Sequence, residues 1–165
     1  MYDGALYTLY NCPYTALSHI PIQKRGPGNP KSRKNKFHYK NCICAFDIET
    51  TNVPEIRQSI MYIWQFCTAD MVCMGRSWDE FILLLQKINQ HFTFSGAPAV
   101  YVIYVHNLAF EFAFASGILT QAGYQYEVFA TRNRKVLTWR IPDLQIEFRC
   151  SAKLTNRSLK KLLKD

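Results

Sequence analysis

The sequence predicts an α/β domain in which helices lie on the faces of a mixed β-sheet. Segments rich in β-branched and aromatic residues alternate with segments whose apolar residues recur at helical spacing, an order typical of such a sheet. Residues 99–105 form a near-continuous apolar run, which is typical of a strand buried on both faces. The chain has 165 residues, of which 48% are hydrophobic and 15% aromatic, so we expect one domain with a sizeable core.

The first 40 residues differ in composition from the rest of the chain. Residues 5–10 are apolar and rich in tyrosine, which suits one strand or one arm of a hairpin. Residues 24–40 contain seven cations, two prolines and two glycines, which favours an extended basic linker or arm. We therefore separate an N-terminal Tyr-rich segment with its basic arm, residues 1–40, from a globular domain, residues 41–165.

Seven segments of the globular part predict strands, because they combine β-branched and aromatic residues with turn-forming residues near their ends. These segments are residues 42–49, 58–67, 70–76, 99–105, 125–130, 135–141 and 144–150. Gly96 and Pro98 mark a loop over residues 93–98, and Pro142 with Asp143 marks a turn.

Three helices are predicted among and after these strands. Ser77 and Glu80 form a capping box, and the helix that they begin keeps its apolar residues on one face until about Gln90. A second helix is expected over residues 108–121. A short basic helix from Asn156 ends the sequence.

The net charge of +8 is unevenly distributed along the chain. Residues 1–46 carry +6, residues 47–130 carry −5, and residues 131–165 carry +7. A negative centre between two positive flanks suggests a site that binds cations while its borders attract a polyanion. Accidental clustering on a solvated surface explains the same distribution equally well.

Neither membrane insertion nor export is expected. No stretch reaches 18 consecutive apolar residues, and the first 30 residues lack the order of a signal peptide. The six cysteines are therefore expected to be reduced thiols. None forms a Cys-x-x-Cys pair of the kind that binds zinc, and most lie in apolar runs, so we expect them to pack as small apolar residues. They are Cys12, Cys42, Cys44, Cys67, Cys73 and Cys150.

A strand of mostly apolar residues ends with two acids, Asp47 and Glu49. Side chains alternate along a strand, so both carboxylates point to one face, with their Cα atoms about 7 Å apart. Two such carboxylates repel each other unless solvent or a divalent cation lies between them, and oxygen ligands suit Mg²⁺ or Mn²⁺. A metal site and an exposed strand end explain this pair equally well.

A second polar pair, Asn107 and Glu111, follows the apolar strand 99–105. Asn107 stands between this strand and a helix, where asparagine is a good N-cap, and Glu111 lies one turn further on the same helix face. The pair is either part of a site or a plain cap followed by an acid that the helix dipole favours. His106 by itself is more typical of a packing residue than of a ligand.

The C-terminal segment 155–164 is strongly basic. Ser158 or Asn156 can cap the helix predicted there, and the first helical amides are then available to a phosphate. An amphipathic surface helix explains this segment without a ligand, and we favour that explanation when the segment is considered by itself.

Taken together, the three motifs resemble one family. Asp-x-Glu-Thr on a strand, then Tyr-x-His-Asn-Leu-x-Phe followed by an acid, then Ser-Leu-x-x-hydrophobic, occur in the order and spacing of the proofreading exonuclease domain of family B DNA polymerases. The resemblance is closest to the protein-primed branch found in small phages and linear plasmids. It covers roughly residues 42–163.

The resemblance implies an RNase H-like fold of the DEDD type and a 3′–5′ exonuclease that uses two metal ions, Mg²⁺ or Mn²⁺. Asp47, Glu49 and Glu111 match the family's catalytic metal ligands, although the family usually has aspartate at the third position. Tyr104 and His106 match positions that touch single-stranded DNA or the priming protein. Positions that hold the 3′-end of single-stranded DNA in the family are matched by Thr50, Asn107, Phe110, Ser158 and Leu159.

The resemblance also implies a larger parent enzyme, a DNA-directed DNA polymerase that acts in DNA replication. The family's third acidic motif, Tyr-x-x-x-Asp, and a lysine motif are missing before Asp165, so we expect a partial exonuclease domain that is incomplete at its C-terminus and weak or inactive alone. The expected partners are the 3′-end of single-stranded DNA, a terminal priming protein and the remainder of the polymerase chain. The expected location is the cytoplasm of a bacterial host, for a protein encoded by a phage or plasmid.

Two other functions fit the same residues. A nucleic-acid-binding or priming-protein-binding module with this fold would need no hydrolysis, and both Glu111 and the missing third acid favour it. A stand-alone nuclease of the same superfamily would differ in its substrate, which could be RNA.

Overall fold

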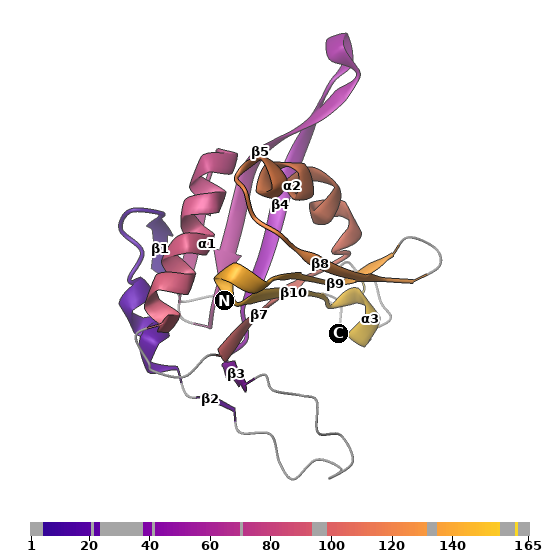
Figure 1. The fold of residues 1–165 in the computed structure, drawn as a ribbon. Helices are drawn as coiled ribbons and strands as arrows, with labels where there is room; N and C mark the ends of the chain where they lie inside the picture. Colours follow the sequence, from indigo (N-terminus) through magenta and orange to yellow (C-terminus); the bar gives the residue numbers. More distant parts are fainter. Residues whose placement is uncertain are drawn as a thin grey trace.

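The structure is a computed structural model of the chain. It describes residues 5–20, 22–23, 38–40, 42–69, 71–93, 99–131, 135–155 and 161. Within these residues, ten strands form one mixed sheet, and two long helices pack against it (Figure 1). None of the helices in the described part of the chain is long and apolar enough to cross a membrane.

Each of the seven strands predicted for the globular part corresponds to one of the strands β4 to β10. The strands are β1 Ala5–Thr8, β2 Ile22–Gln23, β3 His38–Lys40, β4 Ala45–Val53, β5 Gln58–Cys67, β6 Met71–Gly75, β7 Ala99–Val105, β8 Glu127–Ala130, β9 Val136–Ile141 and β10 Ile146–Cys150. The α-helices are α1 Trp78–Thr93, α2 Ala109–Gln121 and α3 Ala152–Thr155. The 3₁₀ helices are η1 Tyr14–His19, η2 Pro54–Ile56 and η3 Pro142–Leu144.

The strand order confirms the predicted mixed α/β sheet. Along the sheet the order is β1-β6-β5-β4-β7-β10-β9-β8, and β3, which carries β2 at its side, pairs with β7. The three strands β4, β7 and β10 run parallel to one another. On one side β5 is antiparallel to both β4 and β6, and on the other side β9 is antiparallel to both β10 and β8. β7 and β10 therefore end at one edge, next to the first residues of β4, which itself runs on to Val53.

Both long helices pack against the same face of the sheet. From α1, the ring of Phe81 lies 5.0 Å from that of Phe46 on β4 and 6.5 Å from that of Phe148 on β10, between ring centroids. From α2, the ring of Phe112 meets that of Trp139 on β9 at 5.3 Å, and Trp139 stacks on Phe148 at 5.0 Å. The aromatic core thus lies between this face and the helices, and we call the other face the open face.

β4 and β5 continue beyond the rest of the sheet as a two-stranded arm (Figure 1). Their pairing shifts by one residue between Glu49 and Thr50 and then continues until Val53 lies opposite Gln58. The sequence predicts this strand only to Glu49, because the residues that follow are polar. Pairing with β5, and not burial, is what extends the strand.

The segment before residue 41 joins the sheet at two places. β1 pairs in parallel with β6, as a strand over residues 5–10 leads one to expect, and β3 pairs in parallel with β7. β3 is a strand where the composition predicts a basic linker, and its Lys40 is only 4% exposed, with Nζ donating a hydrogen bond to the Ile20 carbonyl at 3.0 Å. Residues 24–37, the rest of the predicted arm, lie outside the described residues.

The capping box predicted at the start of α1 is confirmed. The Glu80 N–H donates a hydrogen bond to Ser77 Oγ at 3.2 Å, and the Ser77 N–H donates to Glu80 Oε2 at 3.0 Å. The C-terminal helix predicted from Asn156 falls on residues 156–160 and 162–165, which lie outside the described part of the chain.

Candidate active site

Polar side chains lie next to one another where β7 and β10 end and where β4 passes beyond its pairing with β7. In the register of these strands, Ala45 pairs with Tyr104, which in turn pairs with Arg149. Each of these three residues is followed two positions later by a polar residue: Asp47, His106 and Ser151. These polar residues therefore lie at the same level of the sheet. Ligands of open α/β sheets bind outside the carboxyl ends of the strands, so this edge is the candidate site.

Asp47 and Glu49 lie on the open face of β4. Both are exposed, whereas Phe46 and Ile48, which alternate with them, are buried in the core. Asp47 faces Gln65 across the pairing with β5. The structure therefore has both carboxylates on one face of the strand, as the alternation predicts.

Glu111 is buried in the first turn of α2. It is 3% exposed, and its Oε2 atom has no hydrogen-bond partner among the described residues. Burial raises the pKa of Glu111 to about 8, its own backbone N–H opposes this, and the charge of the Asp47 carboxylate raises the pKa further. The electrostatic influence of Asp47 shows that these two carboxyl groups are neighbours.

A tight turn between β7 and α2 brings Glu111 to this edge. Asn107 is left-handed, with φ of 68°, a conformation that asparagine tolerates better than most residues. The Phe110 N–H donates to the Asn107 carbonyl at 2.9 Å, and Leu108 holds the N-cap position. Of the two alternatives for Asn107, the plain N-cap is therefore wrong, because its backbone closes the turn one residue before the cap.

His106 and Ser151 form a polar contact beside Asp47. Ser151 Oγ lies 3.3 Å from Nδ1 of His106. Both residues and Asp47 line a cavity of about 360 Å³ that lies between the first residues of β4 and the ends of β7 and β10. The other residues around this cavity are Ala45, Phe46, Gln65, Cys67, Val72 and Tyr104.

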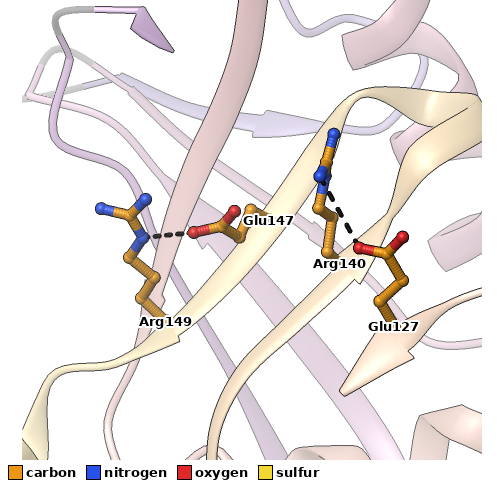
Figure 2. Close-up of polar contacts among 4 residues, drawn as sticks. All are labelled: Glu127, Arg140, Glu147 and Arg149. Atoms are coloured by element: carbon orange, nitrogen blue, oxygen red, sulfur yellow. Dashed lines mark hydrogen bonds and ion pairs between the residues drawn. The ribbon is translucent and has the colours of Figure 1, made fainter. Parts of the chain in front are cut away.

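Two lysines lie near Asn107, around a second cavity. Lys135 and Lys153 are exposed and, together with Asn107, border this cavity of about 240 Å³. Two arginines of this part of the sheet form ion pairs, as Figure 2 shows: Arg149 with Glu147, and Arg140 with Glu127. The N–O distances are 2.5 Å and 3.6 Å. The two lysines are therefore the cations of this edge that are best placed to attract an anion.

The residues present fit a hard divalent cation. Such cations take oxygen ligands, and the pair of Asp47 with Glu111 offers a buried carboxylate oxygen that lacks a hydrogen-bond partner within the described residues. No three His, Cys, Asp or Glu side chains of the described ranges gather into a metal site. Asp47 on β4 and Glu111 on α2 thus form a pair of carboxyl groups, and Glu49 lies two residues after Asp47 on β4.

Solved structures provide the comparison for this fold. No protein-family model matches the chain, and no curated protein matches it. Phi29 DNA polymerase complexed with primer-template DNA is similar to it with a TM-score of 0.61 and 20% identity, over 75% of this chain and 23% of that chain. The chain has a fold that occurs in phi29 DNA polymerase.

Two further structures agree with this result. Phi29 DNA polymerase complexed with single-stranded DNA gives a TM-score of 0.59 at 20% identity, and its orthorhombic crystal form gives 0.60 at 19% identity. Each comparison covers 75% of this chain and 23% of the polymerase, so this chain spans less than a quarter of the length of phi29 DNA polymerase. The predicted resemblance to a protein-primed family B polymerase is confirmed for the fold.

Within this phi29-polymerase-like fold, the predicted site residues fall into three groups. Asp47 and Glu49 lie on one face of β4, and the charge of Asp47 raises the pKa of Glu111 on α2. The predicted DNA-binding positions around them that the structure describes are Thr50, Tyr104, His106, Asn107 and Phe110. The last group, Ser158 and Leu159, lies outside the described residues.

Sequence reasoning did not single out several residues that line the site. They are Gln65, Lys135, Ser151 and Lys153. The excess of cations over residues 131–165 predicts basic residues at the site but does not single out Lys135 and Lys153. Gln65 and Ser151 reach the site through the register of their strands, which no local motif reveals.

Proposed function

We propose that this chain is a 3′–5′ exonuclease region of a protein-primed DNA polymerase and acts on the 3′-end of single-stranded DNA with divalent metal ions. The observation that carries the proposal is the Asp47 carboxylate next to the buried carboxyl group of Glu111, whose Oε2 atom has no hydrogen-bond partner within the described residues. A pair of acids, one on β4 and one buried in the first turn of α2, suits a hard cation better than it suits a structural role.

Asp47 and Glu111 would hold the cation, and Glu49 is the next carboxylate on the strand. When bound, such ions make a water nucleophilic at neutral pH and stabilise the leaving oxygen of a phosphodiester. Because its pKa is raised to about 8, Glu111 holds a proton at neutral pH until a cation displaces it.

Other residues of the edge suit a nucleic-acid strand. Phe110 is 41% exposed, and the centroid of its ring lies 5.1 Å from that of Phe114. It therefore offers an aromatic surface on which a base can stack. Lys135 and Lys153 supply the positive charge that attracts phosphates. DNA as the partner is supported by the similar structures, of which one is complexed with single-stranded DNA and another with primer-template DNA.

The test measures nucleotide release from 3′-labelled single-stranded DNA with Mg²⁺ or Mn²⁺. Nucleotide release is expected with either ion, and Asp47→Ala should abolish it. Asp143→Ala is the matched control, since Asp143 is an exposed acid in η3 that lines neither cavity of the site. Release that Asp47→Ala leaves unchanged would refute the proposal.

A second candidate is a binding module that holds DNA or a priming protein without hydrolysis. The observation that favours it is that no three-ligand metal cluster forms within the described residues. Tight binding of single-stranded DNA in the presence of chelator, together with no nucleotide release in Mn²⁺, would select this candidate over the nuclease.

A further inference from the structure

A second cluster of titratable side chains lies away from the carboxylates, where the chain enters β4. Cys42 and Cys44 are both free thiols, and their Sγ atoms lie 3.5 Å apart. The Sγ atom of Cys44 also lies 2.7 Å from the hydroxyl oxygen of Tyr101 on β7. Cys44 and Tyr101 are fully buried, whereas Cys42 is half-buried.

Cys42 borders a cavity of about 590 Å³, larger than either cavity of the carboxylate edge. Its walls come mainly from apolar residues of the N-terminal segment, such as Leu17 and Ile20, and from Met71 at the start of β6. A small uncharged molecule can therefore reach this thiol through an apolar space, while a charged one would lose hydration there.

The surroundings of Cys42 favour its thiolate. Its pKa is lowered to about 7, first by the hydrogen bond from Cys44, then by Tyr101 and by the positive charge of Lys40, while partial burial opposes these effects. The pKa of Cys44 is raised by its hydrogen bond to Cys42 and by burial, and burial raises that of Tyr101. Both groups therefore keep their protons, and we infer a chain of donors from Tyr101 through Cys44 to Cys42.

The other described cysteines lack this arrangement. Cys12 and Cys73 are buried, and burial raises the pKa of the half-buried Cys67. Cys150 is half-buried and has no thiol neighbour among the cysteine contacts of the described chain. Cys67 and Cys150 are thus internal references of similar exposure for the reactivity of Cys42.

We propose that Cys42 is a modification site that takes small uncharged disulfides by thiol–disulfide exchange from the apolar cavity. The Cys42 thiolate attacks one sulfur of the disulfide R–S–S–R, and the bond between Cys42 Sγ and that sulfur forms as the S–S bond breaks. The other half leaves as a thiolate and takes a proton from water. Cys42 is oxidised to a mixed disulfide, and the departing half of the reagent is reduced.

The expected preference of the reagent for Cys42 over an ordinary thiol follows from the fraction of each thiol that is ionised. At pH 7 a thiol with a pKa near 7 is about half ionised, compared with roughly 1% for an ordinary thiol of pKa 9. The lower basicity of Cys42 reduces its nucleophilicity about tenfold, so a net advantage of about fivefold remains. This proposal does not depend on the proposed function, because no carboxylate of the DNA site takes part.

The experiment treats the full chain at pH 7 with bis(2-hydroxyethyl) disulfide and follows each cysteine by peptide mass spectrometry. Cys42 should acquire the adduct severalfold faster than Cys150 and faster still than Cys67, whose pKa is raised by burial. Charged oxidised glutathione should be slower at Cys42 than the uncharged reagent. Cys44→Ala should slow the reaction at Cys42, and Cys44→Ser, which keeps a donor, should restore most of the rate.

Two controls separate reactivity from unfolding. Cys150→Ala should leave the rate at Cys42 unchanged, and the rate at Cys150 in the Cys44 variants reports whether the fold persists. Equal rates at Cys42, Cys67 and Cys150 in the parent chain would overturn the proposal. A rate at Cys42 that Cys44→Ala leaves unchanged, with an unchanged rate at Cys150, would overturn the activation by Cys44.

Discussion

The hydroxyl oxygen of Ser151 lies 3.3 Å from Nδ1 of His106, at the place where β10 and β7 end side by side. The same hydroxyl donates a hydrogen bond to the Val105 carbonyl at 3.4 Å. We infer that Oγ accepts a hydrogen bond from Nδ1–H, which orients the ring of His106 and leaves its Nε2 as an acceptor. Ser151 is thus a positioning residue for a side chain of the candidate site.

Ser151→Ala should weaken the binding of single-stranded DNA. Without the hydroxyl, the ring of His106 is no longer held, and a lost hydrogen bond of this kind costs about 0.5–1 kcal/mol, a factor of roughly two to five in affinity. Fluorescence anisotropy with a labelled oligonucleotide measures this change. Ser116→Ala, on α2 away from both cavities, should bind as the parent chain does, and equal affinities of the two variants would contradict the positioning role.

Gly75→Ala should destabilise the fold, because a Cβ atom at Gly75 would collide with the ring of Trp64. That ring is fully buried and is fixed by a hydrogen bond of 2.9 Å from its Nε1 to the Ser77 carbonyl, so it has no room to move. We expect a loss of about 1–3 kcal/mol in the free energy of unfolding, measured by urea denaturation.

Gly117 provides the opposite case within α2. A Cβ atom there meets nothing within 4 Å, so Gly117→Ala should stabilise the helix by about 0.5–1 kcal/mol. Equal effects of the Gly75 and Gly117 substitutions would show that the contact between β6 and Trp64 is not as described.

Glu111 should make the stability of the metal-free protein fall as the pH rises. Its folded-state pKa of about 8 lies above the ordinary value of 4.5, so the folded chain binds more protons than the unfolded chain between these values. The contribution of Glu111 is therefore most favourable below about pH 4.5 and is lost as the pH rises through 8.

Urea denaturation in chelator at pH 5 and at pH 8.5 measures this loss. Relative to Glu111→Gln, whose side chain does not ionise, the parent chain should lose on the order of 1–3 kcal/mol between the two pH values. The exposed Asp143→Asn serves as the matched control and should retain the slope of the parent chain. Parallel pH profiles of the parent chain and Glu111→Gln would contradict the burial of this carboxyl group.

The sequence predicts most of the fold because its local signals and its packing agree. The apolar run of β7 and the capping box of Ser77 with Glu80 are local patterns, and both appear where expected. The outer part of β4 is polar and exposed, so only its pairing with β5 makes it a strand. Likewise, β3 is set by its long-range pairing with β7, which composition cannot reveal.

The candidate site is predictable to the extent that it consists of motifs. Asp47 and Glu111 stand in motifs, and the structure brings them together. Ser151 joins the site through the register of β10 with β7, and Asn107 leaves the N-cap position because its left-handed backbone closes the turn. Such effects depend on tertiary geometry, as does the contact of Cys42 with Cys44 beside the N-terminal cavity.

The central claim, that Asp47 and Glu111 share one divalent cation, is tested most directly by titrating Mn²⁺ into the chain and counting the bound ion by electron paramagnetic resonance. Binding should weaken at least tenfold in both Asp47→Asn and Glu111→Gln, and no further in the double variant, whereas Asp143→Asn should bind as the parent chain does. Mn²⁺ affinity that neither single substitution changes would contradict the claim.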